Sequence, residues 1–116
     1  MKALIEAIKE KLEKRGFEVI LNDTLEGISG IQHRFDLLAR KEEIVICVDI
    51  PNPSFMLPAV YGKAIDLPWV KVLVPVKEEN PCSYDHTIDN LSMISYKDVE
   101  DLTRKFERKL KEFLYG

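Results

Sequence analysis

The chain has 116 residues, of which 46% are hydrophobic and 32% are charged, and its formal net charge is −3 at pH 7. This balance predicts one globular domain with a sizeable core, and no apolar run reaches the ~18 residues of a membrane span. The negative charge excludes a general attraction of the monomer to nucleic acid. Binding DNA would need a local basic face, a bound metal or a dimer.

The N-terminal segment carries a charge every few residues, so we expect no signal peptide. Two cysteines are too few for a disulfide framework, and Cys47 falls within an apolar run. We therefore expect a reducing, cytoplasmic compartment. A surface rich in Lys and Glu, with a single glutamine, indicates a thermophile.

Apolar residues at intervals of three and four predict an amphipathic helix over residues 2–15. Gly16 is well placed to end this helix in a left-handed conformation. A short strand is expected over 17–21. The polar residues from Asn22 onward predict a loop.

Two further strands are expected over 34–40 and 44–50, each with one aspartate among apolar residues. The second is a β-branched run, typical of a strand buried on both faces. Because only residues 41–43 link them, the two strands should be antiparallel neighbours. Asp36 and Asp49 would then converge at one place.

Prolines exclude regular structure from residue 51 to about residue 58, where a helix over 58–66 is expected. Strands are expected over 69–76 and 91–94. The polar loop 77–90 between them is long for a compact domain, so it is either functional or mobile.

The final helix follows Ser95, and the spacing of Ser95 and Asp98 resembles a capping box. Its first turn is acidic and its later turns are basic, which matches the helix dipole. The predicted order is αβββαββα, an α/β (α+β) fold with a mixed central sheet flanked by helices.

That order, with Asp36 on the second strand and Asp49 on the third, resembles the restriction-endonuclease-like fold of the PD-(D/E)xK nuclease superfamily. The nearest branches are the small archaeal Holliday-junction resolvases and the Mrr-like proteins. The resemblance implies a single domain over 1–116, in which the two aspartates hold Mg²⁺ or Mn²⁺. Glu6 would match the helix-borne glutamate of the resolvases. Where the family has its lysine, two residues after the second acid, this chain has Pro51.

Three functions stay open, and the proline at the place of the motif lysine favours the second of them. If the amine has moved to Lys63 or Lys71, the protein is a Mg²⁺- or Mn²⁺-dependent endodeoxyribonuclease for structured DNA, working as a homodimer. If the site no longer cuts, the protein is a nucleic-acid- or protein-binding module in DNA transactions. A third possibility is a structural or oligomerisation protein, for which the apolar stretch 54–61 is a candidate surface. That stretch would equally suit packing on the sheet.

Two carboxylates about 4 Å apart repel by roughly 4 kcal/mol at an effective dielectric constant of 20. Such a pair needs a cation, a basic side chain or a proton between its members. Oxygen ligands of this kind suit Mg²⁺ or Mn²⁺. The alternative is that each aspartate is satisfied separately by Arg34, His33, Lys63 or backbone N–H groups.

Other candidates are weaker. His33 would either assist a phosphate or an acid, or bond to loop backbone. A triad of Ser29, His33 and Asp36 lacks a nucleophile elbow. Cys82 and His86 are two soft ligands where a structural zinc site needs four. If nucleic acid binds, the obvious contacts are the basic residues of the first and last helices: Lys9, Lys11, Lys14, Arg15, Lys105, Arg108, Lys109 and Lys111.

Overall fold

The computed structural model describes residues 2–50, 57–77 and 89–115. Its helices are α1 (Lys2–Lys14), α2 (Leu57–Asp66) and α3 (Val99–Tyr115). Its strands are β1 (Glu18–Glu26), β2 (Gln32–Lys41), β3 (Ile44–Val48), β4 (Lys71–Lys77) and β5 (Leu91–Tyr96). This is the predicted αβββαββα order, and the mixed α/β class is confirmed.

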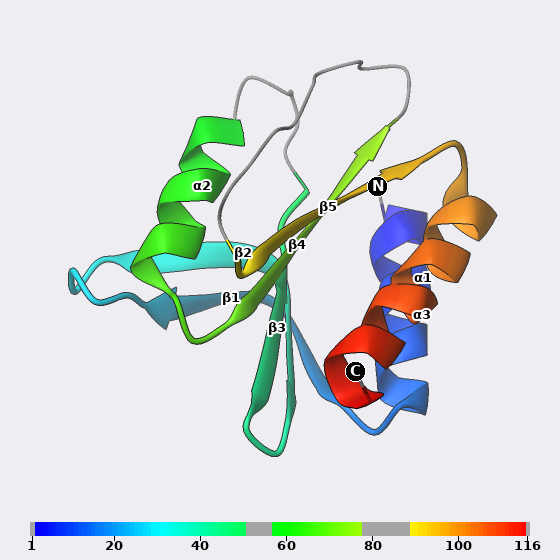
Figure 1. The fold of residues 1–116 in the computed structure, drawn as a ribbon, viewed down its shortest axis with the longest axis horizontal. Coiled ribbons are helices and arrows are strands. Elements are labelled where there is room, and N and C mark those ends of the chain that lie inside the picture. Colours follow the sequence, from blue (N-terminus) through cyan, green and yellow to red (C-terminus); the bar gives the residue numbers. More distant parts are fainter. Residues whose placement is uncertain (1, 51–56, 78–88, 116) are drawn as a thin grey trace.

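The strands pair in chain order, β1-β2-β3-β4-β5. β1, β2 and β3 are antiparallel, as the short link between β2 and β3 predicts, whereas β3, β4 and β5 are parallel. Helices α1 and α3 lie together on one face of the sheet, and α2 lies on the other (Figure 1). The predicted mixed sheet flanked by helices is therefore confirmed.

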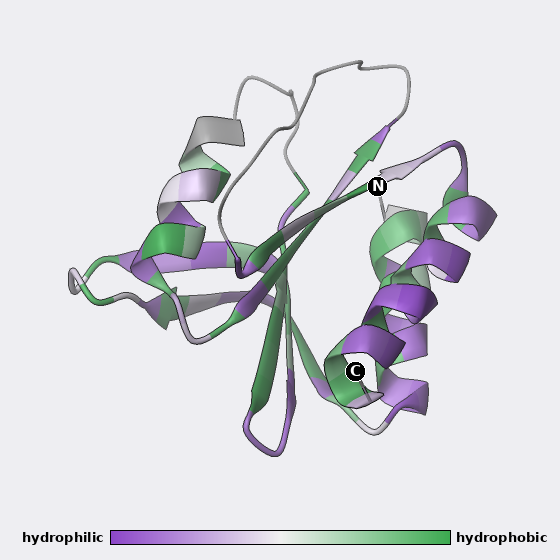
Figure 2. Ribbon diagram, viewed as in Figure 1, coloured by the Kyte–Doolittle hydropathy of each residue, from purple (hydrophilic) through white to green (hydrophobic). Residues whose placement is uncertain are grey.

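Hydrophobic side chains form one core on each face of the sheet. The first core lies under α1 and α3, and its fully buried members include Ile8, Leu12, Leu37, Ile46, Leu102, Phe106 and Leu110. The second lies under α2 and includes Phe35, Leu38, Cys47, Ala64 and Leu67. The outward faces of α1 and α3 are hydrophilic (Figure 2). In the described part of the chain, no helix is both long and apolar enough to cross a bilayer.

The predicted loop at Asn22 is wrong, because β1 runs through it to Glu26. The β1–β2 pairing instead skips the one position at which the register sets Asn22 opposite Asp36. Asn22 has a left-handed backbone, with φ of 52°. Phe35 belongs to the second core and Leu37 to the first, although residues two apart in a regular strand share a face. The side chains of β2 therefore change from one face of the sheet to the other at Asp36.

The predicted start of the final helix is also wrong, by three residues. Strand β5 continues to Tyr96 because Ser95 and Tyr96 still pair with β4. The Asp98 side chain accepts the Asp101 N–H at 2.8 Å, and the Asp101 carboxylate accepts the Lys97 N–H at 3.0 Å. Asp98 is thus the N-cap of α3, and the Asp101 carboxylate binds the N–H of the residue before the N-cap.

Asn90, just before β5, closes the C-terminal end of α2. Its side-chain amide lies 3.0 Å from the Ala64 carbonyl oxygen, 2.9 Å from that of Leu67 and 3.1 Å from that of Val70. The Ala64 and Leu67 carbonyl oxygens also accept the backbone N–H groups of Leu67 and Val70, so Asn90 ties the turn after α2 to the start of β5. This contact holds α2 against the sheet.

Candidate functional site

Asp36 and Asp49 lie next to each other, as the sequence predicts. Leu37 pairs with Val48 across β2 and β3, and the same register sets Asp36 opposite Asp49 one residue beyond β3. The Asp49 N–H donates to the Leu73 carbonyl oxygen at 3.1 Å, which fixes this residue at the end of the sheet. The Asp49 side chain is largely buried.

Lys63 of α2 reaches down to this pair. Its Nζ lies 2.8 Å from Asp49 Oδ2 and 2.5 Å from the Arg34 carbonyl oxygen. The ammonium also sits over the Phe35 ring, 5.0 Å from the ring centroid. Because this carbonyl and this ring belong to β2, the lysine joins α2 to both aspartate-bearing strands.

Asp36 has partners of its own. Its Oδ2 accepts the Ile50 N–H at 2.8 Å, and its Oδ1 lies 3.4 Å from Nη2 of Arg34. The same guanidinium nitrogen donates to the Asn22 side-chain oxygen at 2.6 Å. The two aspartates therefore share one site, and each also has a separate basic or backbone partner there.

Burial raises the pKa of Asp49 above its ordinary value, and the neighbouring Asp36 carboxylate raises it further. The hydrogen bond and positive charge of Lys63 act in the opposite direction. Carboxylates that disfavour each other's charge form a site that a bound cation stabilises. Two carboxylates plus water are a usual ligand set for Mg²⁺, so the donors at this site fit a small divalent cation.

The structure does not bring Glu6 to the two aspartates. Glu6 is exposed on α1, which covers the other face of the sheet. Among residues 2–50, 57–77 and 89–115, no three His, Cys, Asp or Glu side chains gather closely enough to hold a metal. Lys71 lies over the Phe113 ring of α3, 5.7 Å from its centroid, on the face away from α2. Of the two candidate amines, Lys63 is the one at the site.

A second polar cluster, which the sequence did not reveal, is centred on Asp66 at the end of α2. Its Oδ2 accepts the Ser29 hydroxyl at 2.6 Å and lies 2.7 Å from Nε2 of His33. These bonds, Ser29 first, lower the pKa of Asp66. His33 therefore bonds to a carboxylate rather than to loop backbone. Because both Ser29 and His33 bond to Asp66, the Ser29–His33–Asp36 triad does not form.

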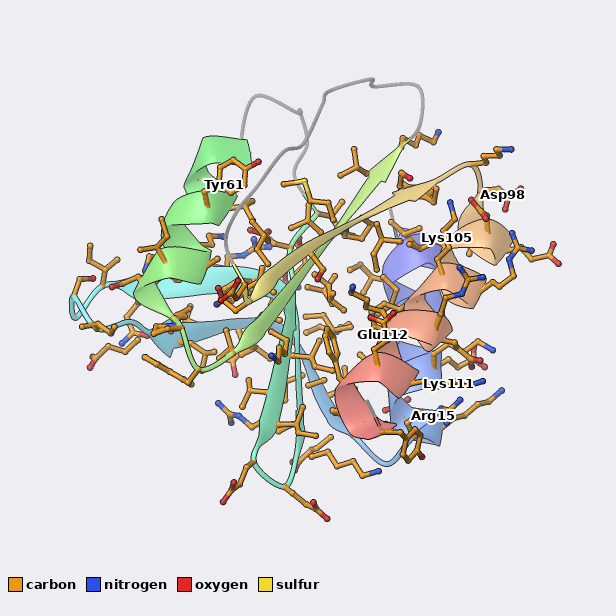
Figure 3. All side chains as sticks on the ribbon, viewed as in Figure 1. Arg15, Tyr61, Asp98, Lys105, Lys111 and Glu112 are labelled. Carbon is orange, nitrogen blue, oxygen red and sulfur yellow. The ribbon has the colours of Figure 1, made fainter. Side chains whose placement is uncertain are left out.

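Several basic residues in and beside α1 and α3 pair with acids. Lys11 and Arg15 reach Glu107, Lys109 reaches Glu112, and both Arg104 and Lys105 reach Asp101. Figure 3 shows Arg15, Lys105 and Lys111 along these two helices, far across the molecule from Tyr61 on α2. The helices expected to contact nucleic acid thus lie on the face away from Lys63.

Several sequence candidates fall outside the described residues: Pro51, Phe55, Met56, Cys82, His86 and most of the loop 77–90. Of the apolar stretch 54–61, Val60 is buried against the second core and Tyr61 is partly buried against it. These two side chains therefore pack on the sheet, which is the alternative that the sequence left open for this stretch.

No family model and no curated protein matches this chain. Among solved structures, it is similar to the crystal structure of a protein of unknown function, AF1548, with a TM-score of 0.56 and 12% sequence identity. The match covers 94% of this chain and 66% of that one, so the chain spans just under two thirds of its neighbour's length. At this identity the similarity concerns the fold alone.

Proposed function

We propose that this protein is a divalent-cation-dependent nuclease of the PD-(D/E)xK type, in which Lys63 takes the role of the missing motif lysine. One observation carries the proposal. The Lys63 ammonium lies 2.8 Å from Asp49 Oδ2, and the Asp36 carboxylate is next to Asp49. An amine and two carboxylates at one place are the groups that the resemblance requires.

Asp36 and Asp49 would hold Mg²⁺ or Mn²⁺, which when bound stabilises charge on a phosphodiester and lowers the pKa of water. Lys63 fixes the Asp49 carboxylate by direct hydrogen bonding. Its remaining N–H can donate to an attacking water or to a phosphate oxygen. The Ile50 N–H holds Asp36 in the same way, so both ligands are oriented before a cation binds.

Cleavage assays test this proposal. Four-way junction, flap, single-stranded and plasmid DNA would be incubated with the wild type in Mn²⁺ and Mg²⁺, beside Asp36→Asn, Asp49→Asn and Lys63→Met. We expect wild-type cleavage that each substitution lowers by at least about a hundredfold. Lys109→Met, at an exposed ion pair with Glu112, is the control and should cut normally. Equal activity in all preparations would indicate a contaminating nuclease and overturn the proposal.

Cation binding can be tested without activity. Mg²⁺ or Mn²⁺ should raise the melting temperature of the wild type because only the folded state presents the paired carboxylates. The rise should be absent in Asp49→Asn. Equal stabilisation of both proteins would remove the cation site.

A second candidate is a DNA-binding module that does not cut. The separate partners of the two aspartates favour it, since Lys63 already balances Asp49 and both Arg34 and the Ile50 N–H contact Asp36. In that case the affinity for DNA would depend steeply on salt concentration. Divalent cations would neither change this affinity nor lead to cleavage of the DNA. For both candidate functions we propose that DNA is the partner and that the protein acts in the cytoplasm. We also propose that it forms a homodimer, which light scattering would test.

A further inference from the structure

Arg34 is the exposed cation beside the Asp36–Asp49 site. Its side chain is 59% exposed, whereas the side chains of Asp36, Asp49 and Lys63 are mostly shielded. We propose that Arg34 is a substrate-binding residue that holds a phosphate of DNA next to the two aspartates. This inference rests on the proposed function, because it names the side chain that binds the substrate at the Asp36–Asp49 site.

The hydrogen bonds of the guanidinium engage one of its three nitrogens and leave the other two free to donate. Both of its contacts, with Asn22 Oδ1 at 2.6 Å and with Asp36 Oδ1 at 3.4 Å, use the same nitrogen, Nη2. Among the described residues, Nε and Nη1 make no hydrogen bond. Both two-donor edges of a guanidinium include Nη2, so Nε and Nη1 would each donate a single hydrogen bond to a phosphate oxygen, and the exposed positive charge would add to the attraction.

Asn22 positions this guanidinium. It occupies the skipped pair of the β1–β2 ladder, opposite Asp36, with φ of 52°. Asparagine adopts this conformation more readily than most residues. The left-handed backbone of Asn22 and the 2.6 Å bond together hold the Arg34 side chain beside Asp36, where β2 changes from one face of the sheet to the other.

The backbone of Arg34 is also tied to the site, since its carbonyl oxygen accepts the Lys63 ammonium. A phosphate held by Arg34 would therefore lie close to both Lys63 and the carboxylates. Arg104 on α3 offers a matched contrast. It is 65% exposed and pairs with Asp101 at 2.6 Å, but it lies on the other face of the sheet.

The test compares Arg34→Gln with Arg104→Gln, which remove the same charge from different faces. A fluorescently labelled four-way DNA junction would be titrated in EDTA over a range of salt, and Kd would be read from anisotropy. Arg34→Gln should weaken binding roughly tenfold and lower the slope of log Kd against log salt by about 1. Arg104→Gln should do neither. Asn22→Gly keeps the left-handed backbone and should weaken binding less, in the same direction.

A thermal melt of each variant separates these effects from loss of folding. Equal losses in Arg34→Gln and Arg104→Gln would show a net-charge effect and overturn the inference, as would absence of DNA binding by the wild type. An unchanged Kd with lowered kcat would make Arg34 a positioning residue for Asp36 and also overturn it. Cleavage in Mn²⁺ is scored separately. A wild type that binds through Arg34 but never cuts refutes the nuclease and leaves the phosphate contact standing.

Discussion

Lys63 of α2 and Asp49 beyond β3 join the helix to the sheet by an ion pair of 2.8 Å that is mostly shielded from solvent. Lys63→Met leaves the Asp49 charge buried without its ammonium, so we expect a loss of about 2–3 kcal/mol in the free energy of unfolding. Urea denaturation would measure it.

The matched control is again Lys109→Met, whose exposed pair with Glu112 should be worth at most about 0.5 kcal/mol. Asp49→Asn added to Lys63→Met should restore part of the stability, because no buried charge then remains unpaired. Similar losses in Lys63→Met and Lys109→Met would argue against a shielded pair.

Asp66 should make folding sensitive to acid. Its pKa is lowered in the folded state, chiefly by Ser29 and then by His33, so it stabilises the fold above the unfolded pKa of about 3.9. That stabilisation disappears as the pH falls through the folded value. Asp66→Asn should therefore be less stable than the wild type at neutral pH, and the gap should be smaller at pH 3.

Urea denaturation at both pH values would measure this gap. Asp101, whose pKa is also lowered, is present in both proteins and does not affect their difference. A gap that widens toward pH 3 would contradict the assignment.

Two glycines should respond oppositely to alanine. A Cβ at Gly27 would overlap the Asp66 carboxylate, so Gly27→Ala should destabilise by about 1–3 kcal/mol. A Cβ at Gly62, inside α2, meets open space, so Gly62→Ala should stabilise by about 0.5–1 kcal/mol. Thermal melts of both variants would show the two signs. Destabilisation by Gly62→Ala would mean that α2 packs differently.

The N-cap of α3 can be assigned by two alanine substitutions. Asp98→Ala removes the acceptor for the Asp101 N–H and should cost about 1 kcal/mol. Ser95→Ala, within β5, should change stability by less than about 0.5 kcal/mol. Urea denaturation would measure both losses. If Ser95 were the N-cap, as the sequence predicts, Ser95→Ala would cause the larger loss and Asp98→Ala the smaller one.

Cys47 should be chemically inert in the folded protein. Burial raises the pKa of its thiol to about 12, and the thiolate is the reactive form. In a Cys82→Ser background, iodoacetamide should label Cys47 only as fast as the protein opens, and urea should accelerate labelling. Rapid labelling at neutral pH without denaturant would show that β3 is accessible.

Local pattern predicted the elements whose residues repeat with a clear period. The stripe with Leu4, Ile8 and Leu12 is buried as expected, and the short link after β2 correctly placed Asp36 beside Asp49. Both inferences use neighbours in sequence, where helix and hairpin geometry leave few choices. Membership of the nuclease superfamily stays a prediction, since the structural neighbour is itself of unknown function.

Long-range contacts decided what the pattern missed. Asn22 is typical of a loop, yet strand pairing on both sides of it carries β1 onward. Ser95 is a good N-cap, but its pairing with Val76 keeps it in β5. The bond between His33 and Asp66 spans 33 residues, and no spacing rule predicts such a contact.

The change of sheet face in β2 at Asp36 couples the two hydrophobic cores. Leu37 and Ala39 anchor the strand in the layer under α1 and α3, while Phe35 anchors it in the layer under α2. Because both hydrophobic cores hold β2, disruption of either core would displace this strand from the other core as well. The two halves of the molecule should therefore melt in a single cooperative transition, with no stable intermediate that keeps only one of them.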